Sequence, residues 1–225
     1  MEILFGYFTY LGVGVKATAF IGVVSFVSAV VIAFVVGVIR FQNVPVLRWI
    51  AFAYVEVFRG TSLLVQLFWL YYTLPLAGIT VSPMAAACLG LALNSGAYGS
   101  EIVRGALAAV SRDQFEAATA LNFSAGQTLW KIVMPQALVE MVPPFGNLAI
   151  LVLKDTALVS MISIADVAFQ AQQLRTFTYD SANIYLVTLL IYFTLALVVM
   201  AIGRLAERYL RPVHMRSPLI FGGAR

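Results

Sequence analysis

Residues 116–138 read EAATALNFSAGQTLWKIVMPQAL and form a mostly small and polar segment within a very apolar chain. Asn122 predicts the end of a first short helix, because asparagine tolerates left-handed backbone better than any other residue except glycine. Ser124 and Gln127 have the spacing of a capping box and predict the start of a second short helix. Pro135 suits the first turn of a further helix. We therefore expect a helix, a turn and a second helix that stand off the apolar part of the chain.

The first short helix has two candidate starts. Asp113 and Glu116 have capping-box spacing, and Ser111 with Gln114 offers an alternative register. The small side chains in this helix are Ala117, Ala118 and Ala120. They leave two interpretations open: a surface helix rich in a good helix former, or a knob that enters a groove on a partner.

The composition places the rest of the chain in a lipid bilayer. Of 225 residues, 62% are hydrophobic and 11% are charged. This share of polar side chains is too small to cover the surface of a water-soluble protein. The net charge of +4 reflects arginines scattered between apolar stretches and does not indicate nucleic-acid binding. Cys88 is the only cysteine and His214 the only histidine, so we expect no catalytic residues and no metal site.

We expect an all-α membrane protein with one transmembrane domain, residues 1–225, and five transmembrane helices. A spanning helix needs about 20 apolar residues. The stretches that qualify are residues 17–39, 47–76, 83–103, 135–153 and 182–203. Glu56 and Arg59 interrupt the second of them. Residues 1–16 lack the features of a removable signal peptide and are expected to form a short interfacial helix before the first span.

The positive charges predict how the chain crosses the membrane. Lysine and arginine gather between spans one and two, between spans three and four, and after span five: Arg40, Arg48, Arg104, Arg112, Lys131, Arg204, Arg208, Arg211, Arg216 and Arg225. Because positive loops stay on the cytoplasmic side, we expect the N-terminus outside and the C-terminus in the cytoplasm. Residues 111–134 are then cytoplasmic.

The segment EAATALNFSAGQTLWKIVMP resembles the EAA loop of permease subunits in bacterial ABC importers. That loop reads Glu-Ala-Ala, three residues, Gly, nine residues, Ile, one residue, Leu-Pro. The chain matches it at Glu116, Ala117, Ala118, Ile132 and Pro135, and departs from it at Asn122 and Met134. In the family, this helix docks in a cleft of the ATP-hydrolysing subunit and transmits its closure. The resemblance therefore assigns ATPase coupling to Glu116, Ala117, Ala118, Asn122 and Pro135.

Three further stretches, VEVFRGTSLLVQL, NSGAYGSEIVRGAL and LKDTALVSMISIADV, resemble the polar amino-acid branch of these permeases, with its histidine, glutamine, arginine and opine types. Ser62 departs from it, since relatives commonly have proline there. The resemblance implies a type I importer permease in the bacterial inner membrane. Its partners would be two ATP-binding subunits, a second permease, a solute-binding protein, a polar amino acid or zwitterion, and membrane lipid. The chain has no phosphate-binding loop motif, so ATP and magnesium belong to the partner ATPase.

Ionisable residues within spans are costly and tend to mark function. Glu56 with Arg59, and Glu101 with Arg104, have the spacing of ion pairs on one helix. These pairs are either structural, or Arg59 binds a substrate carboxylate beside Gly60 and Thr61.

Other polar features lie in the third and fourth spans. Asn94 falls about 16 Å into the third span, near mid-bilayer, among glycines that favour close helix packing. The motif PPFGN, residues 143–147, predicts a break in the fourth span. Asp155 either takes a substrate ammonium, pairs with Lys154 or caps the next turn.

The family resemblance implies solute contacts at Arg59, Gly60, Thr61, Gln66, Asn94 and Asp155. Leu148 stands where some relatives have an acidic residue, which disfavours a cationic amino acid as the solute.

The segment 157–181 is expected on the outer surface, as a gate or as a docking site for the solute-binding protein, with Ser163 capping a helix that has Asp166 in its first turn. The sequence thus predicts the permease subunit of an ATP-driven importer of a polar amino acid or related zwitterion. The alternative is a self-contained secondary carrier, which predicts internal repeats and a proton relay that the sequence does not contain. An intramembrane enzyme would need a nucleophile and base, or a metal set.

Overall fold

The computed structural model describes residues 2–42 and 44–210, and these ranges are helical with no β-strand. The α-helices are α1 (Glu2–Gln42), α2 (Pro45–Gly60), α3 (Leu63–Phe68), α4 (Pro83–Ala109), α5 (Arg112–Ala120), α6 (Ala125–Thr128), α7 (Met134–Asp155), α8 (Val167–Thr178) and α9 (Ser181–Leu210). The π-helices are η1 (Trp69–Thr73) and η3 (Leu129–Val133), and the 3-10 helices are η2 (Leu74–Ala77) and η4 (Thr156–Ile162). His214 and the tail arginines Arg211, Arg216 and Arg225 lie outside the described residues.

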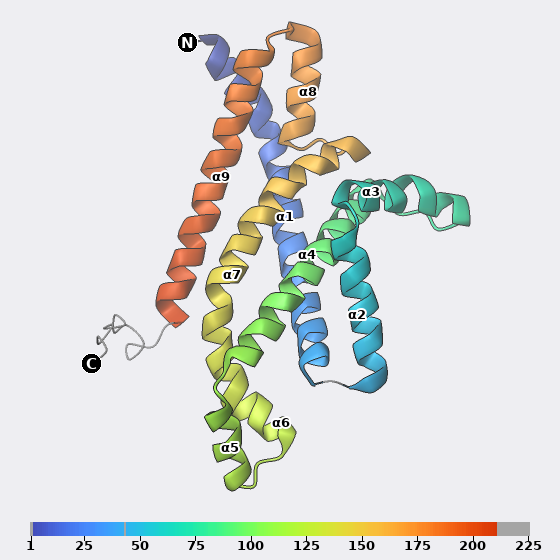
Figure 1. Cartoon of the computed structure of the whole chain (residues 1–225). Coiled ribbons are helices and arrows are strands. Elements are labelled where there is room, and N and C mark those ends of the chain that lie inside the picture. Colours follow the sequence, from blue (N-terminus) through green and yellow to red (C-terminus); the bar gives the residue numbers. More distant parts are fainter. Residues whose placement is uncertain (1, 43, 211–225) are drawn as a thin grey trace, which may run out of the picture.

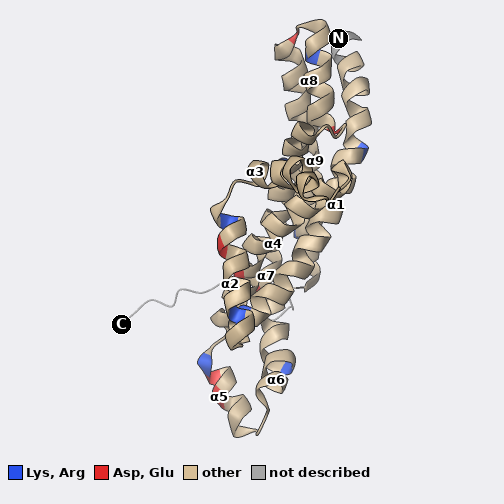
Figure 2. Cartoon of the chain, turned by 90° about the vertical axis from the view of Figure 1, so that its right-hand side faces the viewer, with Lys and Arg blue, Asp and Glu red and all other residues tan. Residues whose placement is uncertain are grey.

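The long helices form an elongated bundle with different structures at its two ends (Figure 1). The start of α1 lies with α8 at one end, and α5 with α6 at the other. Figure 2 shows charged residues at both ends of the bundle and along α2. Residues 111–134 and residues 157–181, which we expect on opposite sides of the membrane, thus lie at opposite ends of the bundle.

Three segments are long and apolar enough to cross a membrane, namely Phe5–Gln42, Ala125–Ile162 and Ser181–Leu210. The bent pair Pro45–Gly60 and Leu63–Ala77 adds a fourth if the two helices count as one crossing. The predicted third span corresponds to helix α4, which packs mainly against α1 and buries 13 of its 27 residues. The all-helical fold is thereby confirmed, while the count of five crossings and their direction stay predictions.

Helix α1 is continuous over 41 residues, so the prediction of a separate interfacial helix at residues 1–16 is wrong. At 1.5 Å per residue the helix is about 60 Å long, twice the hydrocarbon thickness of a bilayer. Its first half continues as a helix because it has a protein partner: Leu11 packs in a cluster with Val167 and Ala171 of α8. Gly14 lets the backbones of α1 and α8 touch, since a Cβ there would lie 2.6 Å from the carbonyl carbon of Asp166.

Helix α4 packs along α1 through small residues. A Cβ on Gly96 would lie 2.8 Å from a methyl group of Ile32, and one on Gly99 would lie 2.8 Å from Ala33. A Cβ on Gly37 of α1 would in turn lie 2.6 Å from Val103. The prediction that the glycines of this span serve close helix packing is therefore confirmed.

Helix α7 runs without interruption through Pro143 and Pro144, so the predicted break at residues 143–147 is wrong. Proline removes backbone donors, but its fixed φ is compatible with a helix once packing holds the surrounding turns. Phe145 stacks on Phe34 of α1 with ring centroids 6.0 Å apart. Gly146 lies close to Gly203 of α9.

Asp166 is fully buried and is the N-cap residue of α8. One carboxylate oxygen accepts a 2.8 Å hydrogen bond from the backbone N–H of Phe169, and the other accepts a 3.1 Å bond from the hydroxyl of Tyr192. Burial raises the pKa of the Asp166 carboxyl, and these hydrogen bonds oppose the rise. The predicted cap at Ser163 is wrong, because Ser163 ends η4 in left-handed backbone with φ 63°.

Candidate functional site

The predicted second span is broken between α2 and α3, where the chain bends by 105°. Thr61 and Ser62 are extended, which separates Gly60 from the first residue of α3. The carbonyl of Phe58 thereby loses its helical partner, because the N–H four residues on belongs to Ser62 beyond the end of α2. A break of this kind needs polar partners from elsewhere in the protein.

Two side chains supply those partners. Asn94 on α4 donates through Nδ2 to the carbonyl oxygen of Phe58 at 2.8 Å and to Oε1 of Gln66 at 3.2 Å. Gln66 donates through Nε2 to the same Phe58 oxygen at 3.0 Å and to the hydroxyl of Thr61 at 2.7 Å. Asn94 is 7% exposed, so solvent does not reach the network from the α4 side. The bend is thus held by hydrogen bonds as well as by packing.

Glu101 on α4 forms ion pairs with three guanidinium groups. Its carboxylate contacts Arg40 at 2.5 Å, Arg104 at 2.9 Å and Arg59 at 3.3 Å. The predicted pair of Glu101 with Arg104 is confirmed. The predicted pair of Glu56 with Arg59 is wrong within the described residues, because Arg59 turns to Glu101 on the neighbouring helix instead.

The guanidinium of Arg59 is held but still accessible. Its central carbon lies 5.3 Å from the ring centre of Tyr98, and the side chain is 41% exposed. A planar cation fixed on an aromatic face and only partly neutralised retains donors for a carboxylate. Sequence reasoning missed Tyr98 and Arg40, because no local spacing links residues on different helices.

Five of the six residues expected to contact a solute come together at the α2–α3 break and the facing part of α4: Arg59, Gly60, Thr61, Gln66 and Asn94. Asp155 is the last residue of α7, half-buried, and within the described chain no hydrogen bond or ion pair joins it to the other five. Leu148, also on α7, is buried and lies beside Gly99.

The turn at Asn122 in the segment 111–134 has the local structure that its sequence predicts. Asn122 is left-handed with φ 59°. The N–H of Phe123 donates to the carbonyl of Ala118 at 3.0 Å, and that of Asn122 to Thr119 at 2.9 Å. These two bonds form the Schellman motif that ends α5.

The second capping box is confirmed, because the side chains and backbones of Ser124 and Gln127 bond reciprocally. Helix α6 then passes through η3 into α7, with Pro135 in the first turn of α7. At the start of α5, Ser111 is the N-cap residue, so the capping box between Asp113 and Glu116 is wrong; Ser111 itself makes no side-chain cap.

Helix α5 has an inner and an outer face. Ala118 is fully buried, and Phe115 packs on the cluster formed by α4, η3 and α7. Glu116 and Ala117 are exposed. Glu116 also borders a hollow of ≈ 470 Å³ together with Phe41 at the end of α1. Only the outer face of α5 is available to a partner, since Ala118 already contacts the bundle.

Comparisons with known proteins match this architecture over nearly the whole chain. The family model described as "Binding-protein-dependent transport system inner membrane component" matches residues 29–212. A probable amino-acid ABC transporter permease of Sinorhizobium fredii is 49% identical over 203 residues, with 88% of this chain and 85% of that protein covered. The glutamine transport system permease of Escherichia coli K12 is 32% identical over 200 residues, with 88% and 91% covered.

Solved structures agree. One chain from the crystal structure of an amino acid ABC transporter with histidines has a TM-score of 0.85 at 30% identity, with 92% of this chain and 97% of that chain covered. An inward-facing MetNI methionine ABC transporter has a TM-score of 0.77 at 21% identity, with 90% and 96% covered, and shows the fold alone.

The family resemblance drawn from the sequence is confirmed, and the alternative of a self-contained carrier receives no support. The type I importer permease architecture and the inner-membrane location follow from the same relatives. The chain belongs to the family of binding-protein-dependent transport system inner membrane components and is a membrane permease subunit of an ABC importer, in which ATP is hydrolysed by a partner subunit.

Proposed function

We propose that this permease moves a polar amino acid, or a related zwitterion, across the inner membrane. It pairs with a second permease, identical or similar, and with two ATP-binding subunits, and it receives the solute from a solute-binding protein. Five helices cross the membrane, with the N-terminus outside. The amino-acid transport named for its 49% identical relative supports this solute class.

The solute carboxylate binds Arg59 at the α2–α3 break. A guanidinium suits this role because it forms paired, charge-assisted hydrogen bonds with a carboxylate. Gly60, Thr61, Gln66 and Asn94 complete the polar wall of the site. Asp155 takes the ammonium group and comes within reach of it when α7 moves during transport.

The outer face of α5 carries the force from the ATPase. When ATP closes the two nucleotide-binding subunits, the helices that bear Glu116 are drawn together and the solute site opens outward. Hydrolysis resets it inward. Rigid connections support this role, because α6, η3 and α7 follow one another without a loop and transmit movement from the segment 111–134 to the bundle.

The observation that carries this proposal is the accessible guanidinium of Arg59 beside a broken helix. The test is the uptake rate and the solute-stimulated ATPase activity of the assembled importer, reconstituted in vesicles with its solute-binding protein. Arg59→Ala should lower the stimulated activity roughly ten-fold or more, because a hydrogen bond to a charged group contributes about 1.5–3 kcal/mol.

Glu56→Gln is the matched control, since this substitution also removes a charge from α2 but at a residue outside the proposed site. It should leave stimulation within about two-fold of the unaltered importer, a free-energy change of roughly 0.5 kcal/mol. Unchanged stimulation in Arg59→Ala would assign Arg59 to the structural ion pairs with Glu101 and remove it from the solute site.

A further inference from the structure

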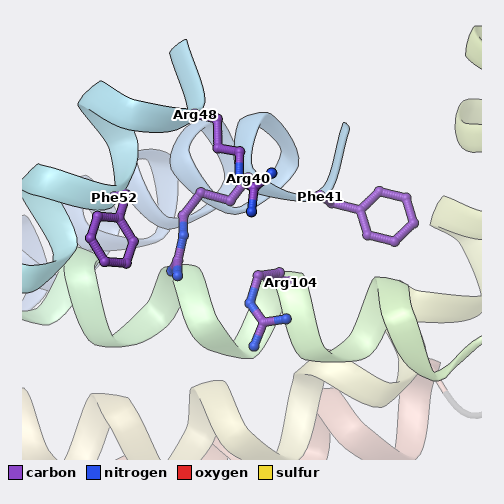
Figure 3. A pocket seen from close by; sticks show the side chains of 5 residues that line it. All are labelled: Arg40, Phe41, Arg48, Phe52 and Arg104. Atoms are coloured by element: carbon purple, nitrogen blue, oxygen red, sulfur yellow. The ribbon is translucent and has the colours of Figure 1, made fainter. Parts of the chain in front are cut away.

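A basic pocket lies between the end of α1, the start of α2 and the facing side of α4. It has a volume of ≈ 430 Å³ and is lined by Arg40, Phe41, Arg48, Phe52 and Arg104. Figure 3 shows the guanidinium groups between the aromatic rings of Phe52 and Phe41, with the arginines contributed by three different helices. The end of α1 and the start of α2, which line the pocket, lie toward the end of the bundle that carries α5 and α6 (Figure 1). The pocket lies toward the start of α2 and the α2–α3 break at its end, while Arg40 and Arg104 share the Glu101 carboxylate with Arg59.

The positive charge in this pocket is not balanced within the described chain. Glu101 is the carboxylate that pairs with Arg40 and Arg104, and it also contacts Arg59. Arg48 is exposed and forms no ion pair with any described residue. Of the three arginines that line the pocket, Arg40 and Arg104 share the single Glu101 carboxylate, and Arg48 adds a further positive charge. Low-dielectric walls strengthen the resulting positive potential, so the pocket is suited to an anion.

The surface next to the pocket selects the kind of anion. On α2, Trp49 adjoins the pocket: its ring centroid lies 6.2 Å from that of Phe52, which lines the pocket, and the two side chains are 73% and 44% exposed. Tryptophan side chains are enriched at the boundary between headgroups and acyl chains. A ligand that fits both parts has a negative head and a long apolar tail.

We propose that this pocket binds the phosphate headgroup of an anionic phospholipid. The phosphate oxygens accept hydrogen bonds from Arg40, Arg48 and Arg104, and the acyl chains lie along the exposed rings of Trp49 and Phe52. Basic pockets between membrane helices bind anionic headgroups by this combination of charge and apolar contact. Arg48 adds the most to the attraction, because its charge is not already shared with Glu101.

The full-length chain in lipid vesicles tests the proposal. Trp69→Phe and Trp130→Phe leave Trp49 as the only fluorescent indole, since the chain has 3 tryptophans. Brominated phosphatidylglycerol and brominated phosphatidylcholine, at equal mole fractions, quench that indole in proportion to their occupancy beside it. Phosphatidylglycerol should quench at a several-fold lower mole fraction. Arg48→Gln should reduce this preference roughly five-fold, the effect of one surface charge of about 1 kcal/mol.

Two variants separate a specific pocket from general attraction to a positive protein. Arg204→Gln removes the same charge from an exposed site on α9 and should leave the preference unchanged. Arg48→Lys keeps the charge and should retain most of the preference. Equal quenching by the two lipids, or an equal loss of preference in Arg48→Gln and Arg204→Gln, would overturn the proposal.

Two other occupants are tested in the same system. Recovery of Trp49 fluorescence on adding glycerol 3-phosphate at constant ionic strength would overturn the proposal in favour of a soluble phosphate. Native mass spectrometry of the assembled importer should detect retained phosphatidylglycerol that Arg48→Gln releases. If phosphatidylglycerol binds the isolated chain but not the assembled importer, the pocket is a contact between subunits and the proposal is overturned.

Discussion

The side-chain amide of Asn94 on α4 donates a 2.8 Å hydrogen bond to the carbonyl oxygen of Phe58 in the last turn of α2. The residues are 36 positions apart in the sequence. The bond satisfies a carbonyl that the break between α2 and α3 leaves without its helical donor. It therefore fixes the bend beside the proposed solute site.

Asn94→Leu should lower the free energy of unfolding by about 1–2 kcal/mol, because it removes two hydrogen bonds and leaves the Phe58 carbonyl with Gln66 alone. Thermal unfolding of the purified chain in detergent measures the change. Asn147→Leu is the control, since Asn147 is exposed on α7, and its effect should stay within about 0.5 kcal/mol. Equal losses in the two variants would argue against a structural role for the Asn94 bonds.

Glu101→Gln should destabilise the protein by roughly 3 kcal/mol, because it leaves Arg40, Arg59 and Arg104 without their shared carboxylate. The lower end of the range for buried pairs applies, since the Glu101 side chain is 25% exposed. Chemical denaturation at constant ionic strength measures the loss. Glu56→Gln, which removes an acid that pairs with no described residue, should change stability by less than about 0.5 kcal/mol.

Glu116→Lys should abolish uptake and the coupling of ATP hydrolysis to the solute, while the amount of protein in the membrane stays unchanged. A cation on the exposed outer face of α5 repels the partner surface that accepts a carboxylate there. Transport assays and quantitative membrane immunoblots measure both quantities. Gln114→Lys, also exposed on α5 but two positions away and so on the opposite side of the helix, should retain uptake. Wild-type transport in Glu116→Lys would exclude the docking role.

Gly14→Ala should lower the free energy of unfolding by about 1–3 kcal/mol, because the new Cβ would lie 2.6 Å from the backbone of Asp166 and Val167. Gly12→Ala, two residues earlier in α1, meets nothing within 4 Å and should stabilise the helix by up to about 1 kcal/mol. Thermal unfolding in the same detergent measures both changes in the free energy of unfolding, which should have opposite signs. Two stabilised variants would show that α1 and α8 are not in backbone contact.

Features that depend on neighbours in the sequence could be predicted. The left-handed turn at Asn122 and the capping box of Ser124 with Gln127 rest on contacts within four residues. The pair of Glu101 with Arg104 is of the same kind, one turn apart on α4. Such contacts form wherever the helix forms, so the residue types and their spacing are sufficient.

Two of the failed predictions have a common cause. Helical spacing allows Arg59 to pair with Glu56, whereas in the structure Arg59 contacts Glu101 on another helix. Pro143 and Pro144 were expected to break a span, and packing against α1 and α9 keeps α7 continuous. In each case a long-range contact outweighs the local preference, and no short motif records which helices become neighbours.

The amino-acid sequence by itself determined that the chain is helical and belongs to the lipid bilayer, because 62% apolar residues cannot be covered by 11% charged ones in water. It also determined the helix–turn–helix segment before Pro135, through local hydrogen bonds. Only the tertiary structure decided which polar groups meet. It joined Arg40, Arg59 and Arg104 at one carboxylate and brought Asn94 to the bend in α2, because those partners are neighbours only after the helices pack.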